Sequence, residues 1–282
     1  MSSDPGSSAG RARRELGLRL RQVRRAAGLT GRALAERIGC HPSSVSRIES
    51  GGQAAGPATV RDWCVACDAA ERIPDLLALA GSLDSSYLEW DRQARAGMRR
   101  LGDLHSVETY RRTRLFRIHG PVLLPGIFQT EAYIRRMLAF WYPFLGAPDD
   151  AEATVAMRAE RTAAALAPGK RIVVVLGEQA VRTRRGPAQE HLDQLTHLLS
   201  VMRRPYVSVG IVPADARRYA IAGIGFWILD GGTVALETPT AAIKVTQPRE
   251  IARYATLFAH LQAEAVYGAE ARALITDVMN GG

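Results

Sequence analysis

Four polar side chains within one eight-residue segment have the chemistry to read the edges of DNA bases. Ser43, Ser44, Ser46 and Arg47 lie in the segment that runs from residue 42 to residue 49. A serine hydroxyl both donates and accepts hydrogen bonds, and an arginine guanidinium can donate two parallel hydrogen bonds to guanine. Arg47 is therefore the strongest candidate for guanine recognition, and the serines are candidates for neighbouring base edges.

Such side chains need a helix that presents them together on one face. The stretch GRALAERIGCHPSSVSRIES predicts a helix over 31–38, a tight turn at Gly39 and a second helix over 42–49. Val45 and Ile48 form the apolar pair of the second helix, so the serines and Arg47 fall on its outer face. Two short helices joined in this way predict a helix-turn-helix, whose second helix fits the major groove.

The flanking sequence predicts three further helices, over 12–27, from Pro57, and over 71–80. Gly28 is placed to end the first helix, and Thr30 to cap the second. The turn lacks a hydroxyl at the N-cap of the 42–49 helix. We therefore predict an all-α N-terminal domain of five helices over residues 11–81, preceded by a short disordered tail over residues 1–10.

The charge of the chain also points to an anionic partner. The 37 basic residues outnumber the 28 acidic ones, and all but two are arginines, which codon usage alone could produce. Residues 1–50, however, hold ten arginines against four acidic residues, and residues 92–117 hold eight against two. This concentration favours a nucleic-acid partner over codon usage. The second cluster either extends the phosphate contacts or rests against acidic residues of the C-terminal domain.

Phosphate contacts position a protein on DNA without specifying sequence. The candidates for these contacts are Arg32, Arg61 and backbone N–H groups near Gly51 and Gly52. Other arginines of the first helix are expected only to solvate its surface.

The cysteines admit two interpretations. Cys64 and Cys67, with Cys40 and His41, supply ligand types that zinc prefers. Cys64 and Cys67 also share an apolar helix face with Val60, and buried cysteine packs as a small hydrophobe, so core packing is favoured. We expect no metal and no cofactor. The three cysteines, the absence of an apolar leader and the short apolar runs predict a cytoplasmic protein.

The N-terminal residues carry a family resemblance. LGLRLRQVRRAAGLT, LAERIG and SSVSRIESG together resemble the lambda-repressor/Cro-like, or XRE-type, helix-turn-helix. The resemblance implies a DNA-binding domain with its recognition helix at 42–49. Gly31 stands where many members have a glutamine that reaches a phosphate, and Arg32 or the helix N-terminus would take over that contact.

From Asp84 onward the sequence predicts a mixed α/β (α+β) domain with a small sheet. Helices are expected over 84–101, 131–140, 149–167, 187–202, 248–267 and 269–279. Strands are expected over 115–118, 171–176, 206–212, 224–229, 234–236 and 243–245. Asp230-Gly231-Gly232 predicts a hairpin turn, and Thr130 a helix cap.

This domain shows no catalytic pattern. Gly223-x-Gly225 precedes a hairpin rather than a helix, so it is not a dinucleotide loop. His191 and His197 are six residues apart and do not share a helix face. The C-terminal domain also lacks HExxH and GxSxG patterns. We expect a protein that is not an enzyme.

A second resemblance covers nearly all of the C-terminal domain. LLPGIFQTEAYIRRML, VVVLGEQAVR, VSVGIVP and GFWILDGG are similar, in this order, to WhiJ-like actinobacterial regulators, which are described as antitoxin-like. The resemblance implies a regulatory or partner-binding domain over residues 82–282.

Gln129, Tyr133 and Glu237 are candidates for the rim of a ligand or partner site, although turn and cap roles are favoured around Gln129. Trp141, Tyr142 and Phe144 suggest a partner surface, although core packing is favoured for them.

Two functions remain. The first is a sequence-specific DNA-binding transcriptional regulator that acts as a homodimer and senses a small molecule or protein partner. The alternative is an antitoxin-like protein that binds a small partner protein and regulates its own operon.

Overall fold

The computed structural model describes residues 8–81, 87–89, 106–217, 219–220, 222–239 and 241–281. The chain divides into two compact units, each described here by itself. The N-terminal unit comprises residues 1–86 and 245–250, and the C-terminal unit comprises residues 87–244 and 251–282. No described helix is long and apolar enough to cross a membrane.

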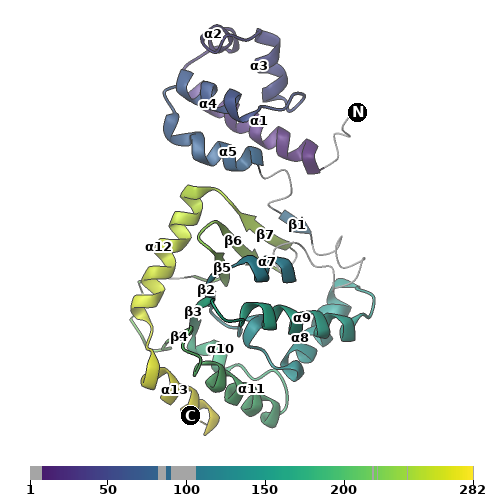
Figure 1. Ribbon diagram of the computed structural model, residues 1–282, viewed down its shortest axis with the longest axis vertical. Helices are drawn as coiled ribbons and strands as arrows, with labels where there is room; N and C mark the ends of the chain where they lie inside the picture. The colour runs from purple at the N-terminus through teal and green to yellow at the C-terminus, as the bar shows by residue number, and fades with distance from the viewer. Residues whose placement is uncertain are drawn as a thin grey trace. The chain divides into compact units, whose positions relative to one another are not determined.

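The N-terminal unit is helical, as predicted (Figure 1). Its elements are α1 (Ser8–Ala26), α2 (Gly31–Arg37), α3 (Pro42–Glu49), α4 (Pro57–Ala66), the 3-10 turn η1 (Ala70–Arg72) and α5 (Ile73–Gly81). The α3 helix has the predicted bounds. The predicted tail over 1–10 is helical in its last three residues, because α1 begins at Ser8.

Local chemistry sets the ends of these helices. Gly28 and Gly39 have φ values of 69° and 66°, the left-handed conformation that ends α1 and turns the chain between α2 and α3. The Thr30 hydroxyl accepts a hydrogen bond from the Ala33 N–H at 3.1 Å, which confirms the predicted cap of α2.

One apolar core holds the helices of the N-terminal unit together. It is built from the buried side chains Leu16, Leu20, Val23, Leu34, Ala35, Val45, Ile48, Val60, Trp63, Cys64, Cys67 and Leu76. The Trp63 indole N–H donates to the Leu20 carbonyl at 3.1 Å, so the largest buried side chain is also hydrogen-bonded.

The C-terminal unit is built on a seven-stranded mixed sheet in the described residues, with strand order β1-β7-β6-β5-β2-β3-β4. Its strands are β1 (Tyr87–Glu89), β2 (Leu115–Gly120), β3 (Arg171–Gly177), β4 (Val207–Val212), β5 (Phe226–Leu229), β6 (Thr233–Glu237) and β7 (Ala241–Val245). Strands β2, β3 and β4 are parallel, whereas β5 pairs antiparallel with both β2 and β6. The predicted hairpin turn joins β5 to β6, with Asp230 and Gly231 at positive φ.

Helices cover both faces of this sheet, which confirms the α+β class. They are α7 (Val107–Arg112), η4 (Gly126–Phe128), α8 (Glu131–Leu145), α9 (Ala151–Ala165), α10 (Glu178–Arg182), α11 (Ala188–Val201), α12 (Pro248–Glu264) and α13 (Gly268–Met279). Phe226 of β5 contacts Tyr254 and Phe258 of α12, with ring centroids 5.1 and 6.3 Å apart. Its neighbour Trp227 points to the opposite face and stacks on Tyr110 of α7.

The sequence missed some short elements of this unit. The helix predicted over 84–101 is wrong at residues 87–89, which form β1 and pair antiparallel with β7, and the rest of it lies outside the described residues. Helices α7 and α10 have six and five residues, too few to show a helical period. The Thr130 cap of α8 is confirmed, since its hydroxyl accepts from the Tyr133 N–H at 3.3 Å.

Candidate nucleic-acid interface

Helix α3 turns its apolar side chains inward and its polar ones outward. Val45 and Ile48 are buried, whereas Ser43, Ser46 and Arg47 are exposed. Ser44 is half-buried, and its hydroxyl oxygen accepts a hydrogen bond of 3.4 Å from Arg47 Nη2. A bond this long leaves the guanidinium available to a stronger acceptor. The four predicted base-reading residues therefore share the outward side of one helix.

The N-terminus of α3 is capped by an imidazole instead of a hydroxyl. His41 is the N-cap residue, and its Nδ1 accepts a hydrogen bond from the Ser43 backbone N–H at 3.2 Å. The same nitrogen lies 2.8 Å from the Ser43 hydroxyl oxygen. The sequence shows that a hydroxyl is missing here, but the substitute becomes visible only in the structure. This cap orders the first turn of α3, which carries Ser43 and Ser44.

The C-terminus of α3 is fixed to α1 by a two-point ion pair. Arg24 donates from Nε and Nη2 to the two carboxylate oxygens of Glu49, at 2.6 and 2.9 Å, and from Nη1 to the Leu29 carbonyl at 2.7 Å. The hydrogen bonds that Arg24 donates to Glu49 raise the pKa of Arg24. This pair is a positioning element that sequence reasoning missed, because 25 residues separate its partners.

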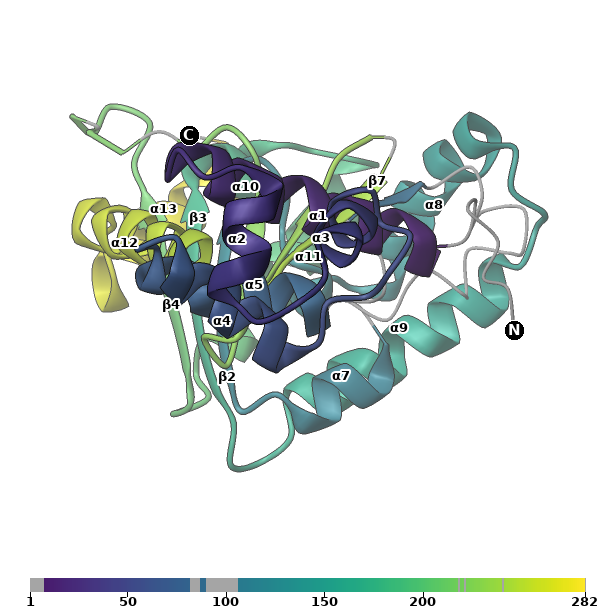
Figure 2. The same ribbon diagram turned by 90° about the horizontal axis from the view of Figure 1, so that it is seen from above.

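Close backbone packing adds to this connection. A Cβ atom built on Gly17 of α1 would lie 2.3 Å from the Ile48 carbonyl oxygen, so only glycine fits where α1 crosses the end of α3. Figure 2 shows α2 and α3 side by side in the same unit. The recognition helix is therefore held at both ends and along its buried side.

The candidate phosphate-contacting arginines lie outside α3. Arg32 of α2 is exposed, and within the described residues its one ion pair is with the exposed Glu36 at 3.4 Å. Arg61 of α4 is exposed and has no ion-pair partner among the described residues. No described contact joins either arginine to the outward side chains of α3. The Gly51 N–H, a predicted phosphate donor, instead donates to the Ile48 carbonyl at 3.0 Å.

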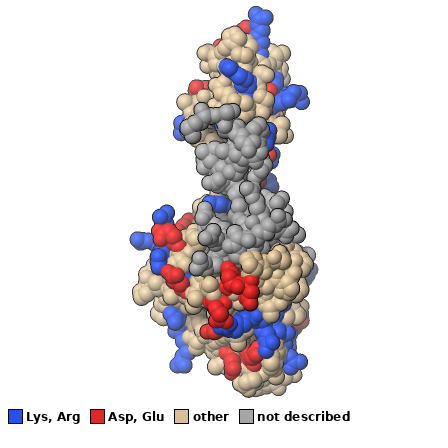
Figure 3. Space-filling view, turned by 90° about the vertical axis from the view of Figure 1, so that its right-hand side faces the viewer, with Lys and Arg blue, Asp and Glu red and all other residues tan. Residues whose placement is uncertain are grey.

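The second arginine cluster is described only in part, because residues 92–105 lie outside the described residues. Within its remainder, Arg111 pairs with Glu160 at 2.7 Å and Arg112 pairs with Glu108 at 2.7 Å. These two arginines rest against acidic residues of their own unit. On the face that Figure 3 shows, basic and acidic side chains are interspersed over the C-terminal unit.

Cys64 and Cys67 are buried in the core of the N-terminal unit, and Cys40 packs against that core. Burial raises the pKa of the Cys64 thiol to about 11. In the described part of the chain, no group of three or more His, Cys, Asp or Glu side chains is arranged to hold a metal ion.

The three candidates for a ligand or partner site lie in two places of the C-terminal unit. Gln129 Nε2 donates to the Leu124 carbonyl at 2.7 Å, and Tyr133 is buried in the core cluster that contains Leu124. Glu237, at the end of β6, interacts electrostatically with Arg158 of α9 instead. No described contact joins Glu237 to the other two.

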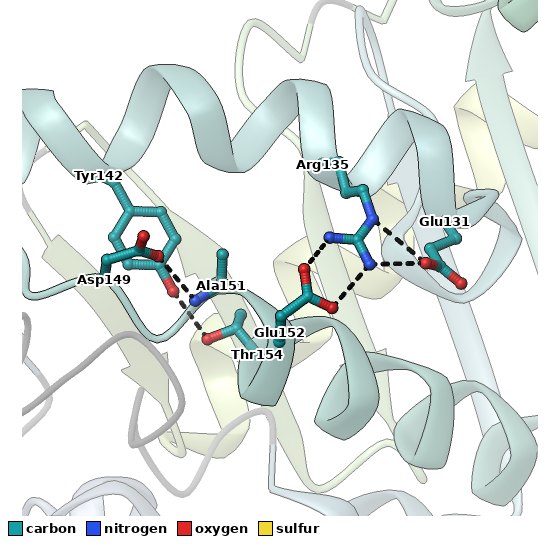
Figure 4. A network of polar contacts seen from close by, with 7 residues as sticks. All are labelled: Glu131, Arg135, Tyr142, Asp149, Ala151, Glu152 and Thr154. Atoms are coloured by element: carbon teal, nitrogen blue, oxygen red, sulfur yellow. Dashed lines mark hydrogen bonds and ion pairs between the residues drawn. The ribbon is translucent and has the colours of Figure 1, made fainter.

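Helices α8 and α9 are joined by a polar network (Figure 4). Arg135 bridges Glu131 of its own helix, at 2.7 Å, to Glu152 of α9. The Tyr142 hydroxyl lies 3.0 Å from the Thr154 hydroxyl. The network fixes the angle between the two helices.

The end of α8 carries an exposed aromatic cluster. Phe140 and Phe144 are 59% and 53% exposed and stack on each other, with ring centroids 5.5 Å apart. The half-buried Trp141 contacts Phe144 edge-on at 5.4 Å. The favoured interpretation of core packing is therefore wrong for Phe144, while Trp141 and Tyr142 pack against a small core cluster.

Comparison with known proteins also separates the N-terminal from the C-terminal part of the chain. A family model described as a helix-turn-helix domain matches residues 15–78. The chain thus carries a helix-turn-helix, a domain that supports DNA binding. A second model, described as a domain of unknown function (DUF5753), matches residues 101–277, and the chain belongs to this family. No curated protein matches the chain. No solved structure matches it either.

Proposed function

We propose that the chain is a sequence-specific DNA-binding transcriptional regulator that reads the major groove with α3. The observation that carries this proposal is the fixed outward presentation of Ser43, Ser44, Ser46 and Arg47. The His41 cap and the Arg24–Glu49 pair hold the two ends of their helix. A helix that is already ordered loses little conformational freedom on binding, so more of its contact energy contributes to affinity.

Phosphate contacts come from Arg32 and Arg61 in this proposal. Both are exposed and make at most a weak surface ion pair within the described residues, so binding DNA requires little loss of protein contacts. The protein acts as a dimer on a two-fold site with half-sites roughly 34 Å apart. It is a cytoplasmic protein of the XRE type without enzymatic activity, and the C-terminal unit senses a ligand or a protein partner.

The alternative, an antitoxin-like protein with a small protein partner, is favoured by one feature. The exposed rings of Phe140 and Phe144 form an apolar surface of the kind that protein interfaces enrich. In this alternative, DNA binding serves to regulate the protein's own operon. The resemblance to WhiJ-like actinobacterial regulators supports both functions.

The first experiment captures genomic DNA fragments with the full-length protein and then measures affinities for a captured site and a random duplex. Arg47→Ala is expected to weaken binding to the captured site by about 1–3 kcal/mol. Its affinity for the random duplex is expected to stay nearly unchanged. Arg61→Ala is the matched variant, and it is expected to lower the affinity for both duplexes alike. An equal loss on both duplexes in Arg47→Ala excludes Arg47 as a base reader.

The second experiment separates the two functions by co-purification. The antitoxin-like function requires a stoichiometric small protein that is lost from the double variant Phe140→Ser, Phe144→Ser. A copurifying protein that remains bound to this variant excludes the aromatic cluster as its docking surface. The absence of any stoichiometric partner favours the regulator.

A further inference from the structure

Two arginines of α9 lie on the side of the helix that faces the core. Thr154, Arg158, Arg161 and Ala165 follow one stripe of the helix, at spacings of four, three and four residues. Thr154 and Ala165, at the two ends of this stripe, are fully buried. Arg158 and Arg161 are half-buried, so the stripe carries two charged groups toward the interior of the C-terminal unit.

Neither guanidinium is satisfied by the described part of the chain. Arg158 and Arg161 donate no hydrogen bond and form no ion pair within the described residues, and the Nε atom of Arg161 is buried without a hydrogen-bond partner there. Arg24 of the N-terminal unit, which is similarly enclosed, donates three hydrogen bonds. A buried donor without a partner is costly, and native proteins tolerate few of them.

Tyr110 and Glu237 interact electrostatically with both arginines, and two further aromatic rings pack on Tyr110. Tyr110 of α7 stacks on Trp227 of β5 with centroids 5.7 Å apart, and Phe116 of β2 meets the Tyr110 ring edge-on at 5.6 Å. Trp227 is paired with Ala235 of β6, so Glu237, two residues further along, points to the same face of the sheet. Because Tyr110 is buried among these rings, the arginine pair lies beside an apolar cluster.

The charges of this cluster do not balance. Burial lowers the pKa of both arginines, that of Arg161 to about 10, and each also interacts with the negative charge of Glu237. At neutral pH both guanidinium groups remain charged, so among the described residues two positive charges face one carboxylate. Since like charges in an apolar site repel each other strongly, a second anion there would lower the free energy of the unit.

We propose that Arg158 and Arg161 form a binding site for the oxyanion group of a small molecule, a phosphate or a carboxylate, in the C-terminal unit. The planar guanidinium presents paired N–H donors whose spacing matches both kinds of oxyanion. The negative charge of Glu237 beside both arginines disfavours an anion that carries no donor group. Binding of the oxyanion does not require α3 to bind DNA, because both arginines belong to the C-terminal unit.

The test is calorimetric titration of the full-length protein in phosphate-free buffer, with inorganic phosphate in one arm and succinate in the other. Saturable binding in either arm is expected, and the arm that binds more tightly identifies the kind of oxyanion. Arg158→Met and Arg161→Met are each expected to weaken that binding about tenfold or more, because each removes a charged donor fork. Arg112→Gln, which alters an exposed arginine of α7, is the control that retains binding.

Circular dichroism melts of each variant, taken with the titration, show whether the unit is still folded. The proposal is overturned if neither anion binds the wild-type protein saturably, or if both methionine variants bind as tightly as wild type. The proposal is also overturned if Arg112→Gln loses as much anion affinity as the methionine variants. General surface charge would then explain the binding. Since the titration uses no DNA, its outcome is separate from that of the DNA-binding experiments.

Discussion

The two units of the molecule use the same residue type in opposite ways. In the N-terminal unit the half-buried Arg24 donates three hydrogen bonds and holds α3, while Arg47 and Arg61 are exposed. In the C-terminal unit the partly exposed Arg135 is paired with acids on two helices, while the half-buried Arg158 and Arg161 receive no acceptor from the described residues. The contrast between Arg24 and the Arg158–Arg161 pair is therefore one between a guanidinium group that the protein satisfies and two that its described residues do not.

The largest effect is expected from breaking the satisfied pair in the N-terminal unit. Glu49→Ala removes both carboxylate acceptors of Arg24, whose side chain is only 12% exposed. The unpaired charge is expected to lower the free energy of unfolding of this unit by about 3 kcal/mol, measured by chemical denaturation with hydrogen exchange at α1 and α3.

The matched control is Arg19→Ala, which breaks the half-exposed pair between Arg19 and Glu15. This change is expected to cost less than about 0.5 kcal/mol. Similar losses in the two variants would show that enclosure of the Arg24–Glu49 pair adds nothing to stability.

Replacing an unsatisfied arginine is expected to change the free energy of unfolding in the opposite direction. Arg158→Met replaces a poorly paired charge with an apolar side chain of similar length, so it is expected to raise the free energy of unfolding by about 1 kcal/mol in ligand-free buffer. Thermal melts of the full-length protein measure this change. A clear loss of stability would mean that Arg158 is satisfied in the native state, and the contrast between the units would disappear.

A smaller effect is expected at the unusual cap of the recognition helix. His41→Ala removes the Nδ1 acceptor of the Ser43 N–H and is expected to cost about 1 kcal/mol, whereas His41→Ser restores a side-chain acceptor and most of that loss. Hydrogen exchange at the first turn of α3 reports the change directly. Unchanged exchange in the alanine variant would show that the imidazole does not cap α3.

Much of the N-terminal unit can be predicted from residue types, because its signals are local. Gly28, Gly39 and Thr30 act within one or two turns, and the period of Val45 and Ile48 identifies the buried side of α3. The Arg24–Glu49 pair has no local signal, since its partners meet only when α1 packs on α3.

The C-terminal unit is less predictable because its site depends on tertiary contacts. The strand runs and the Asp230 turn are visible in the sequence, but strand order and the three-residue β1 are not. By residue type alone, Arg158 and Arg161 read as a solvated helix face. Only the burial of Thr154 and Ala165 on the same stripe shows that this face points inward.

The smallest effect is expected at the buried thiols, in their reactivity and in the pH dependence of stability. Because burial raises the pKa of Cys64 to about 11, its thiol stays protonated in the native state at pH 8 and is expected to resist alkylation, whereas the half-buried Cys40 reacts. The raised pKa means that the unfolded state loses the proton first, so the free energy of unfolding falls as the pH rises from about 9 towards 11. Mass spectrometry measures the rate at which each thiol of the native protein is alkylated. If Cys64 reacts as fast as Cys40, the placement of Cys64 in the core is contradicted.

The salt dependence of DNA affinity tests the central claim most directly. If the N-terminal unit binds DNA through arginine–phosphate contacts, the logarithm of the affinity of the full-length protein falls linearly with the logarithm of salt concentration. With about six contacts, the loss is on the order of a thousandfold between 50 and 200 mM salt. An affinity that does not change over this range would contradict DNA binding by this protein.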